Sequence, residues 1–165
     1  MQHPNLKIKN YIYIGLFAII SLIHSCENKS KLNERQKIII DNAELFKKKD
    51  RDFLEKHLSN SKKKYDVVIL VEKKCEFDKE VYLKKVLSEF SGKFNSDKIV
   101  LFYFLVDEKD IYIRTSELLG LSNDICADIL SKIMPEFRNN NFSAGVIKGL
   151  ELIDSNLKKD ITKTE

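Results

Sequence analysis

Ile99-Val-Leu-Phe-Tyr-Phe-Leu-Val106 is an unbroken apolar run, rich in β-branched and aromatic residues. Polar residues bound it on both sides, with Asp97-Lys98 before it and Asp107-Glu-Lys-Asp110 after it. An apolar run of this length between turn signals is typical of a strand that is buried on both faces. Such a strand needs one layer of structure above it and another below it, and we expect helices elsewhere in the chain to supply them.

The composition favours one globular domain. The chain has 165 residues, of which 43% are hydrophobic and 10% aromatic, which is enough for one core but not for two. Its 29 basic and 25 acidic residues are interspersed and leave a net charge of +4. Because neither an Arg-rich helix nor a basic surface interleaved with aromatic residues is apparent, we expect no nucleic-acid partner.

Segments on both sides of the central run extend the predicted sheet. Asp66–Val71 is predicted to be the first strand, and Asp78–Phe94 carries an apolar stripe at helical spacing. Strand, helix and strand in this order predict a right-handed βαβ unit with parallel strands. Ile111–Arg114 follows a short polar turn, which predicts an antiparallel edge strand. Ile38–Ile40 is an extended segment that leads into a turn at Asp41–Ala43.

Three further helices follow from apolar spacing and capping residues. One covers Lys48–Asn60 with Phe53 on its inner face, one begins after the N-cap Ser122 and ends at Pro135, and one begins near Ser143. We therefore expect an α/β fold. Its architecture is a three-layer α/β/α sandwich with a small mixed sheet, built from the βαβ unit and the antiparallel edge strand.

The amino terminus resembles an export signal. Lys7 and Lys9 precede an apolar stretch, Tyr11–Ile23, that is short for a membrane span. Leu22-Ile-His-Ser-Cys26 resembles a bacterial lipobox, the site where signal peptidase II cleaves before a cysteine that becomes lipidated.

The lipobox resemblance implies three segments at this end of the chain. Residues 1–25 would be a lipoprotein signal peptide, Cys26 the lipidated residue carrying palmitate or a similar acyl chain, and residues 26–35 a tether. The alternative is an uncleaved signal anchor with an incidental cysteine. In both cases we expect the domain in the bacterial cell envelope, attached to a membrane and facing the periplasm or the exterior.

Two cysteines remain in the predicted mature domain, Cys75 and Cys126. In an oxidising compartment they could form a disulfide, and the alternative is two separate thiols, buried or half-buried. No Cys-x-x-Cys or His-x-x-x-His spacing supports a zinc site. His57 alone remains of the three histidines once the signal is removed, and a lone helical histidine is usually part of the packing.

Four short motifs, in order along the chain, resemble the TPM domain family. The family patterns are V-D-x-A-x-x-L, G-L-E-x-x-L-T-D, I-x-P-x-F-K/R and D/N-Y-x-x-G-I-x-x-G/A. The matching segments are Ile40–Phe46, Leu118–Asp124, Ile133–Arg138, and Phe142–Gly145 with Gly149. The resemblance implies an α/β/α sandwich that is tethered to a membrane and faces away from the cytoplasm. It predicts a TPM-like domain over residues 36–159 and a tail over residues 160–165.

The resemblance also implies a range of functions. Family members assemble or repair membrane complexes or modulate a membrane receptor, and some bind calcium or have weak acid phosphatase activity. Asp41, Glu72 and Asp124 are the candidate calcium ligands, because calcium needs several carboxylate or other oxygen ligands from different segments. Glu72 ends a predicted parallel strand, and Asp41 and Asp124 are the acidic positions that match the family motifs. The alternative is local: Asp41 caps a turn and Asp124 supports a helix start. The segment Ile113–Leu119 lacks the glycines and glutamates of the family's E-V-G-x-G-L-E motif.

Two functions from different classes follow. The first is a membrane-tethered binding or interaction domain that helps to maintain or assemble a membrane or envelope complex, with an unidentified envelope protein as partner. The second is a calcium-dependent weak phosphatase. The chain has no G-x-S-x-G elbow, P-loop or Cys-x5-Arg signature, so we expect no catalytic residues and no cofactor other than the candidate calcium ion. Phe137 and Phe142 are either an exposed contact cluster or buried anchors.

Overall fold

The computed structural model describes residues 35–61 and 63–161. Four strands form one sheet in the order β1-β2-β3-β4, with β1, β2 and β3 parallel and β4 antiparallel to β3. The strands are β1 (Lys37–Asp41), β2 (Asp66–Glu72), β3 (Ile99–Leu105) and β4 (Asp110–Thr115). The predicted α/β fold, with its antiparallel strand at the edge of a mixed sheet, is confirmed.

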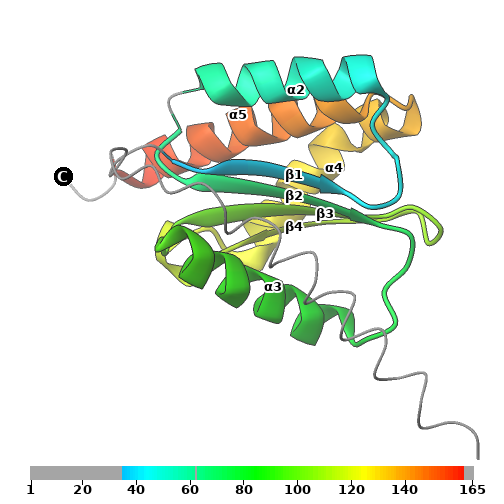
Figure 1. Cartoon of the computed structure of the whole chain (residues 1–165). Coiled ribbons are helices and arrows are strands. Elements are labelled where there is room, and N and C mark those ends of the chain that lie inside the picture. The colour runs from blue at the N-terminus through cyan, green and yellow to red at the C-terminus, as the bar shows by residue number, and fades with distance from the viewer. Residues whose placement is uncertain (1–34, 62, 162–165) are drawn as a thin grey trace, which may run out of the picture. The chain divides into compact units, whose positions relative to one another are not determined.

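Helices cover both faces of the sheet (Figure 1). On one face lies α3 (Lys79–Phe94), and on the other lie α2 (Lys48–Asn60), α4 (Asn123–Arg138) and α5 (Phe142–Ile161). A 3-10 turn, η1 (Glu117–Leu119), joins β4 to α4. The result is the expected three-layer α/β/α sandwich. Within the described part of the chain, no helix is both long enough and apolar enough to cross a membrane.

The central strand β3 explains why two helical layers are needed. All seven of its residues are buried, and successive side chains point to opposite faces. Phe102 and Phe104 pack into the core under α2, α4 and α5, whereas Leu101 and Tyr103 pack into the core under α3. Residue Gly149 lets α5 approach the strand closely, because a Cβ there would lie 3.0 Å from the Phe102 ring.

The sheet has one more parallel strand than the sequence predicted. Lys37–Asp41 pairs with β2 as β1, so the prediction that Asp66–Val71 begins the sheet is wrong. Strand β1 has only five residues, and the residue at each end is charged, so it lacks the long apolar run that marks a buried strand. All five residues are only half-buried. Pairing with β2 creates a second βαβ unit, in which α2 crosses between parallel strands.

Two details of the predicted helices are also wrong. Helix α4 continues through Pro135 to Arg138, because the added turn places Phe137 in the core at 5% exposure. Burial of an aromatic ring of this size outweighs the one backbone hydrogen bond that proline removes. On α2, Phe53 is 57% exposed and does not belong to the inner face, which Leu54 and Leu58 occupy.

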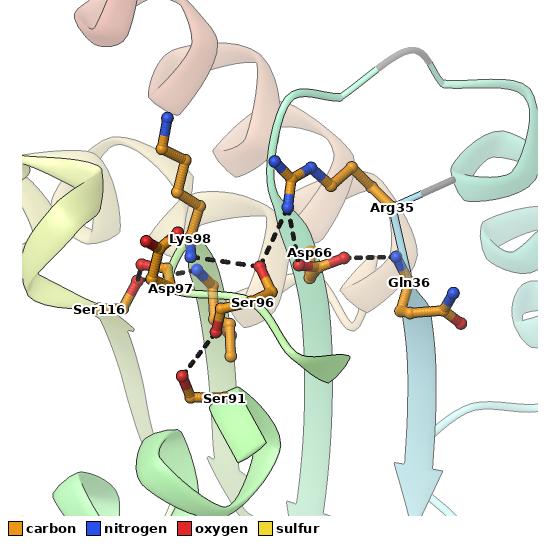
Figure 2. A network of polar contacts seen from close by, with 9 residues as sticks. Arg35, Gln36, Asp66, Ser91, Ser96, Asp97, Lys98 and Ser116 are labelled. Carbon is orange, nitrogen blue, oxygen red and sulfur yellow. Dashed lines mark hydrogen bonds and ion pairs between the residues drawn. The ribbon is translucent and has the colours of Figure 1, made fainter. Parts of the chain in front are cut away.

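A polar network closes the edge of the sheet where the parallel strands begin (Figure 2). Its centre is Asp66, a carboxylate only 2% exposed. Asp66 accepts hydrogen bonds from the backbone N–H of Gln36 and from the Arg35 guanidinium, and Arg35 also donates to the Ser96 hydroxyl at 3.0 Å. Arg35, which the sequence assigned to the tether, therefore contacts the folded domain. The predicted signal peptide and Cys26 lie outside the described residues.

Candidate functional site

The opposite edge of the sheet, where the parallel strands end, contains a pocket. Three connections surround it: the segment between β1 and α2, the turn between β3 and β4, and the turn between α4 and α5. Its volume is about 420 Å³, within the range of roughly 300–1,000 Å³ that ligand sites occupy. Most of its wall is apolar and is formed by Leu45, Phe104, Val106, Ile111, Met134 and Phe142.

Aromatic side chains hold this wall in one arrangement. The Phe104 ring lies edge-on to Phe137 and Phe142, with centroid distances of 5.5 Å and 6.3 Å, and Phe137 stacks on Phe142 at 6.1 Å. The ring of Phe137 presses against Gly145, where a Cβ would lie 2.2 Å from the nearest ring atom. A glycine is therefore required at position 145, because any side chain would displace Phe137 from the pocket wall.

Asp41, at the carboxyl end of β1, stabilises the turn that contributes Leu45 to the wall of the same pocket. Its two carboxylate oxygens accept hydrogen bonds from the backbone N–H groups of Leu45, at 3.0 Å, and Phe46, at 2.9 Å. These bonds close the turn that places Leu45 in the pocket wall. The local alternative for this candidate metal ligand, a turn cap, is thus the arrangement that the structure shows.

Charged side chains stand at the rim of the pocket. Lys109 and Arg138 are exposed, and no described residue forms an ion pair with either. Asp110, the carboxylate of the lining, pairs with Lys79 at 2.7 Å and accepts a hydrogen bond from the Tyr112 hydroxyl at 3.2 Å. The Lys79 ammonium holds the pKa of Asp110 below its usual range. Asp110 is therefore ionised, and it shares the Lys79 ammonium with Glu108, which lies 2.6 Å from the same nitrogen. Lys109 and Arg138 are thus the rim cations that no described carboxylate pairs with.

A second hollow of about 300 Å³ adjoins the pocket. The two share Leu45, Asn140 and Phe142, and the second adds Lys47 and Asp50 to its lining. It is more polar than the first, because fewer apolar side chains stand beside its cation and its carboxylate.

Glu72, the second candidate metal ligand, lies on the other face of the sheet. Its carboxylate accepts hydrogen bonds from the hydroxyls of Tyr82, at 2.9 Å, and Tyr103, at 2.6 Å. Burial, and next the bond to Glu72, raise the pKa of Tyr103, while burial and the charge of Glu72 raise the pKa of Tyr82. Both phenols therefore stay protonated and donate, so Glu72 is occupied in joining α3 to the sheet.

The structure does not bring the three candidate calcium ligands together. Asp41 pairs in register with Val71, whose side chain lies under α2, α4 and α5, whereas the next residue, Glu72, points towards α3. Asp124 lies in the first turn of α4, at the opposite edge of the sheet, where Thr115 contacts Leu121. Across residues 35–61 and 63–161, no group of three His, Cys, Asp or Glu side chains could hold a metal ion.

The two cysteines occupy opposite faces of the sheet. Cys126 is 1% exposed in the core under α2, α4 and α5, and Cys75 packs at the border of the core under α3. Both are free thiols in this structure, as in the alternative that the sequence left open. Burial raises the pKa of the Cys126 thiol, which makes it a packing residue and a poor nucleophile.

Several residues of the pocket escaped the sequence analysis. Lys109 lies in the turn between β3 and β4, whereas Met134 and Arg138 lie one turn apart on α4, and no local pattern marks Lys109 as their neighbour. Phe137 and Phe142 were identified, and the structure favours buried anchors over an exposed cluster, because Phe137 is buried and Phe142 half-buried. The motifs Ile133–Arg138 and Phe142–Gly145, which contain these two phenylalanines, were the available signals for this wall.

Comparison with solved structures gives the same fold. The NMR structure of BA42 from the psychrophilic bacterium Bizionia argentinensis superposes with a TM-score of 0.61 at 19% identity, covering 72% of this chain and 86% of BA42. The NMR structure of the N-terminal domain of a P. gingivalis protein gives 0.53 at 20% identity, covering 73% and 83% of the two chains. At these identities the likeness shows the fold alone.

Comparison with family sequences is more specific. A search of curated proteins gave no significant match. Residues 39–155, however, match the TPM domain, and this range includes all four strands except the first two residues of β1. The match covers well over half of the chain and contains the four motifs in order. This chain belongs to the TPM domain family.

Proposed function

We propose that this protein is a lipid-anchored TPM-domain protein of the bacterial cell envelope that binds an envelope protein and so helps to maintain or assemble a membrane complex. The observation that carries the proposal is the apolar pocket of about 420 Å³ where the parallel strands end. Ligands of open α/β sheets bind at this edge. An apolar wall with a few charged groups at its rim is the composition of a binding site.

The residues around the pocket favour binding over catalysis. Neither serine, cysteine nor histidine contributes to the lining of the pocket or of the adjoining hollow, so a nucleophile paired with a base is missing from these linings. Asp41 and Asp110 have local partners that hold their carboxylates. A carboxylate fully engaged by backbone N–H groups or by an ammonium is poorly placed to activate water.

The pocket lies at the edge of the sheet opposite to the one where the chain enters the domain. Arg35, the first described residue, lies at the edge where β1 begins, and the pocket lies at the other edge, where the strands end. A strand of seven residues such as β3 separates the two edges by about 23 Å. The chain therefore enters the described domain at the edge away from the pocket.

The lipid anchor is tested by replacing its cysteine. The Cys26→Ser protein is expected to stay unprocessed or to leave the membrane fraction, and to lose labelling by a palmitate analogue. Unchanged size, fractionation and acyl labelling would contradict the anchor. His24→Ala is the matched control, because it changes the lipobox without removing the acylated atom and is expected to retain labelling.

The binding site is tested by photo-crosslinking from within the pocket. The chain has two methionines, Met1 in the predicted signal peptide and Met134 in the pocket wall, so cells grown on photo-methionine place the reactive group of the mature domain at position 134. Irradiation is expected to join the domain to one envelope protein. The Met134→Leu variant keeps the volume of the side chain and removes the crosslink. Failure to form a crosslink to any protein would contradict the proposed function.

A further inference from the structure

The pocket and the adjoining hollow form one groove. They share Leu45, Asn140 and Phe142 as a common wall, so a ligand that leaves the first space enters the second without crossing another element. The two spaces differ in character: the larger is mostly apolar, and the smaller contains Lys47 and Asp50. A ligand that matches both must be extended, with a large apolar group at one position and polar groups next to it.

Charge favours an anionic group on such a ligand. The groove contains three cations, Lys47, Lys109 and Arg138, and two carboxylates, Asp50 and Asp110. Asp110 pairs with Lys79 at 2.7 Å, and Lys79, which lies outside the groove, also pairs with Glu108 at 2.6 Å. With Lys79 and Glu108 included, the charges leave a positive excess of about one. The cations without an ion-pair partner among the described residues, Lys109 and Arg138, stand at the rim of the apolar pocket. Complementary charges at a rim select a partner and raise the rate of association.

We infer that the groove binds an extended peptide segment of the partner, in which a large apolar side chain fills the pocket and adjacent acidic residues meet Lys109 and Arg138. This inference rests on the proposed function and adds the chemical class of the ligand. A peptide fits the two spaces better than a membrane lipid does, because the second space is polar and an extended peptide offers polar groups to Lys47 and Asp50, which an acyl tail lacks. The groove also lies at the edge of the sheet that the tether does not join.

Direct binding of defined peptides tests this ligand class. The mature chain, held in lipid nanodiscs, is titrated into fluorescein-labelled Ser-Phe-Glu-Glu-Ser, and fluorescence anisotropy reports binding. Ser-Phe-Lys-Lys-Ser removes the charge match, and Ser-Ala-Glu-Glu-Ser removes the apolar group. We expect the first peptide to bind at least about tenfold more tightly than either of the others, with an advantage over the lysine peptide that shrinks as salt is added.

Charge reversal at the rim gives the sharper comparison. In Lys109→Glu/Arg138→Glu, the preference between the glutamate and lysine peptides is expected to reverse. Lys84→Glu/Lys98→Glu changes the net charge equally at two exposed positions outside the groove and is expected to keep the original preference. All four positions are exposed, so both variants should melt within a few degrees of the unchanged protein.

The peptide inference and the proposed function can fail independently, and different results reject each of them. Equal affinity for the glutamate and lysine peptides, no binding of any peptide, or displacement of all peptides by decanoate at lower concentration would each overturn the peptide inference. Peptide binding with the expected preference supports it, even if Met134 gives no crosslink in cells, a result that would count against the proposed function alone. A crosslink to an envelope protein, combined with indifference to peptide charge, would keep the proposed function and reject the groove chemistry.

Discussion

The two edges of the sheet differ in how they use polar side chains. At the edge where the strands begin, Asp66, Arg35 and Ser96 bond to one another and to the backbone (Figure 2). At the edge where the strands end, on the side of α2, α4 and α5, the side chains of Lys109 and Arg138 stand at the rim of an apolar pocket. The first edge is closed by satisfied hydrogen bonds, and the second offers unused charge and apolar surface.

Polar groups at the two edges contribute to different properties, namely stability at the first edge and binding at the second. A group whose hydrogen bonds are made inside the fold contributes to the free energy of unfolding, and its loss leaves a buried partner unsatisfied. A group that meets only solvent contributes little to stability and can be used for a ligand. Substitutions at the closed edge should therefore change the melting temperature, and substitutions at the open rim should change affinity.

The largest effect on stability is expected at the closed edge. Asp66→Ala removes the acceptor of the Gln36 N–H and of the Arg35 guanidinium, and loss of these charge-assisted bonds should lower the free energy of unfolding by about 3 kcal/mol. Urea denaturation measures this change in the free energy of unfolding. The matched control is Asp97→Ala, because only the backbone carbonyl of exposed Asp97 accepts a bond in this network, from Ser116. Equal stability of the two variants would contradict the structural role of Asp66.

A somewhat smaller effect is expected at the tyrosine pair on Glu72. Tyr103→Phe deletes the 2.6 Å bond to this carboxylate and should cost about 2 kcal/mol, whereas Tyr112→Phe, whose ring is half-buried, should cost less. Urea denaturation at neutral pH compares the two.

The same pair gives a pH dependence with a defined sign. The pKa of Tyr103 is raised above its ordinary value, chiefly by burial, so its contribution is complete below the unfolded phenol pKa of about 10 and declines as the pH rises above it. The alkaline loss of stability should therefore be shallower in Tyr103→Phe than in the unchanged protein. An identical alkaline profile would show that Tyr103 ionises freely in the folded state.

The turn that Asp41 closes is expected to affect both stability and peptide affinity. Asp41→Ala removes two hydrogen bonds to the backbone of Leu45 and Phe46 and should lower stability by about 1 kcal/mol, as loss of a helix cap does. It should also weaken binding of the Ser-Phe-Glu-Glu-Ser peptide, because Leu45 forms part of the wall. Asp124→Ala, at an exposed position of the other edge, should leave peptide affinity unchanged. Equal peptide affinities in these two variants would show that the Asp41 turn does not contribute to the binding site.

The smallest effect concerns calcium. Since Asp41, Glu72 and Asp124 lie at different faces and edges of the sheet, calcium at millimolar concentration is expected to leave the melting temperature unchanged. A ligand that binds only the folded state would raise it by mass action. A saturable rise that disappears in Asp41→Ala would restore the family's calcium chemistry to this chain and make a phosphatase assay worthwhile.

The elements with strong local patterns were predicted closely, and those that depend on pairing were not. The helix predicted over Lys48–Asn60 has those bounds, and the helix predicted over Asp78–Phe94 differs only in that Asp78 is its N-cap. The strand β1 was missed because five half-buried residues show no periodicity of their own. Helix α4 passes Pro135 because burial of Phe137, a contact with distant residues, outweighs a local preference.

The sequence by itself determined the class of the fold, its two helical layers and its family motifs, because apolar periodicity and capping residues act over a few neighbouring positions. Only the tertiary structure decided the site. Leu45, Ile111 and Met134 meet because the strand register and the helix packing bring three connections to one edge. The same packing holds Asp41 in a turn and turns Glu72 to the opposite face. Such neighbours are set by contacts between distant segments, which no local pattern of residues contains.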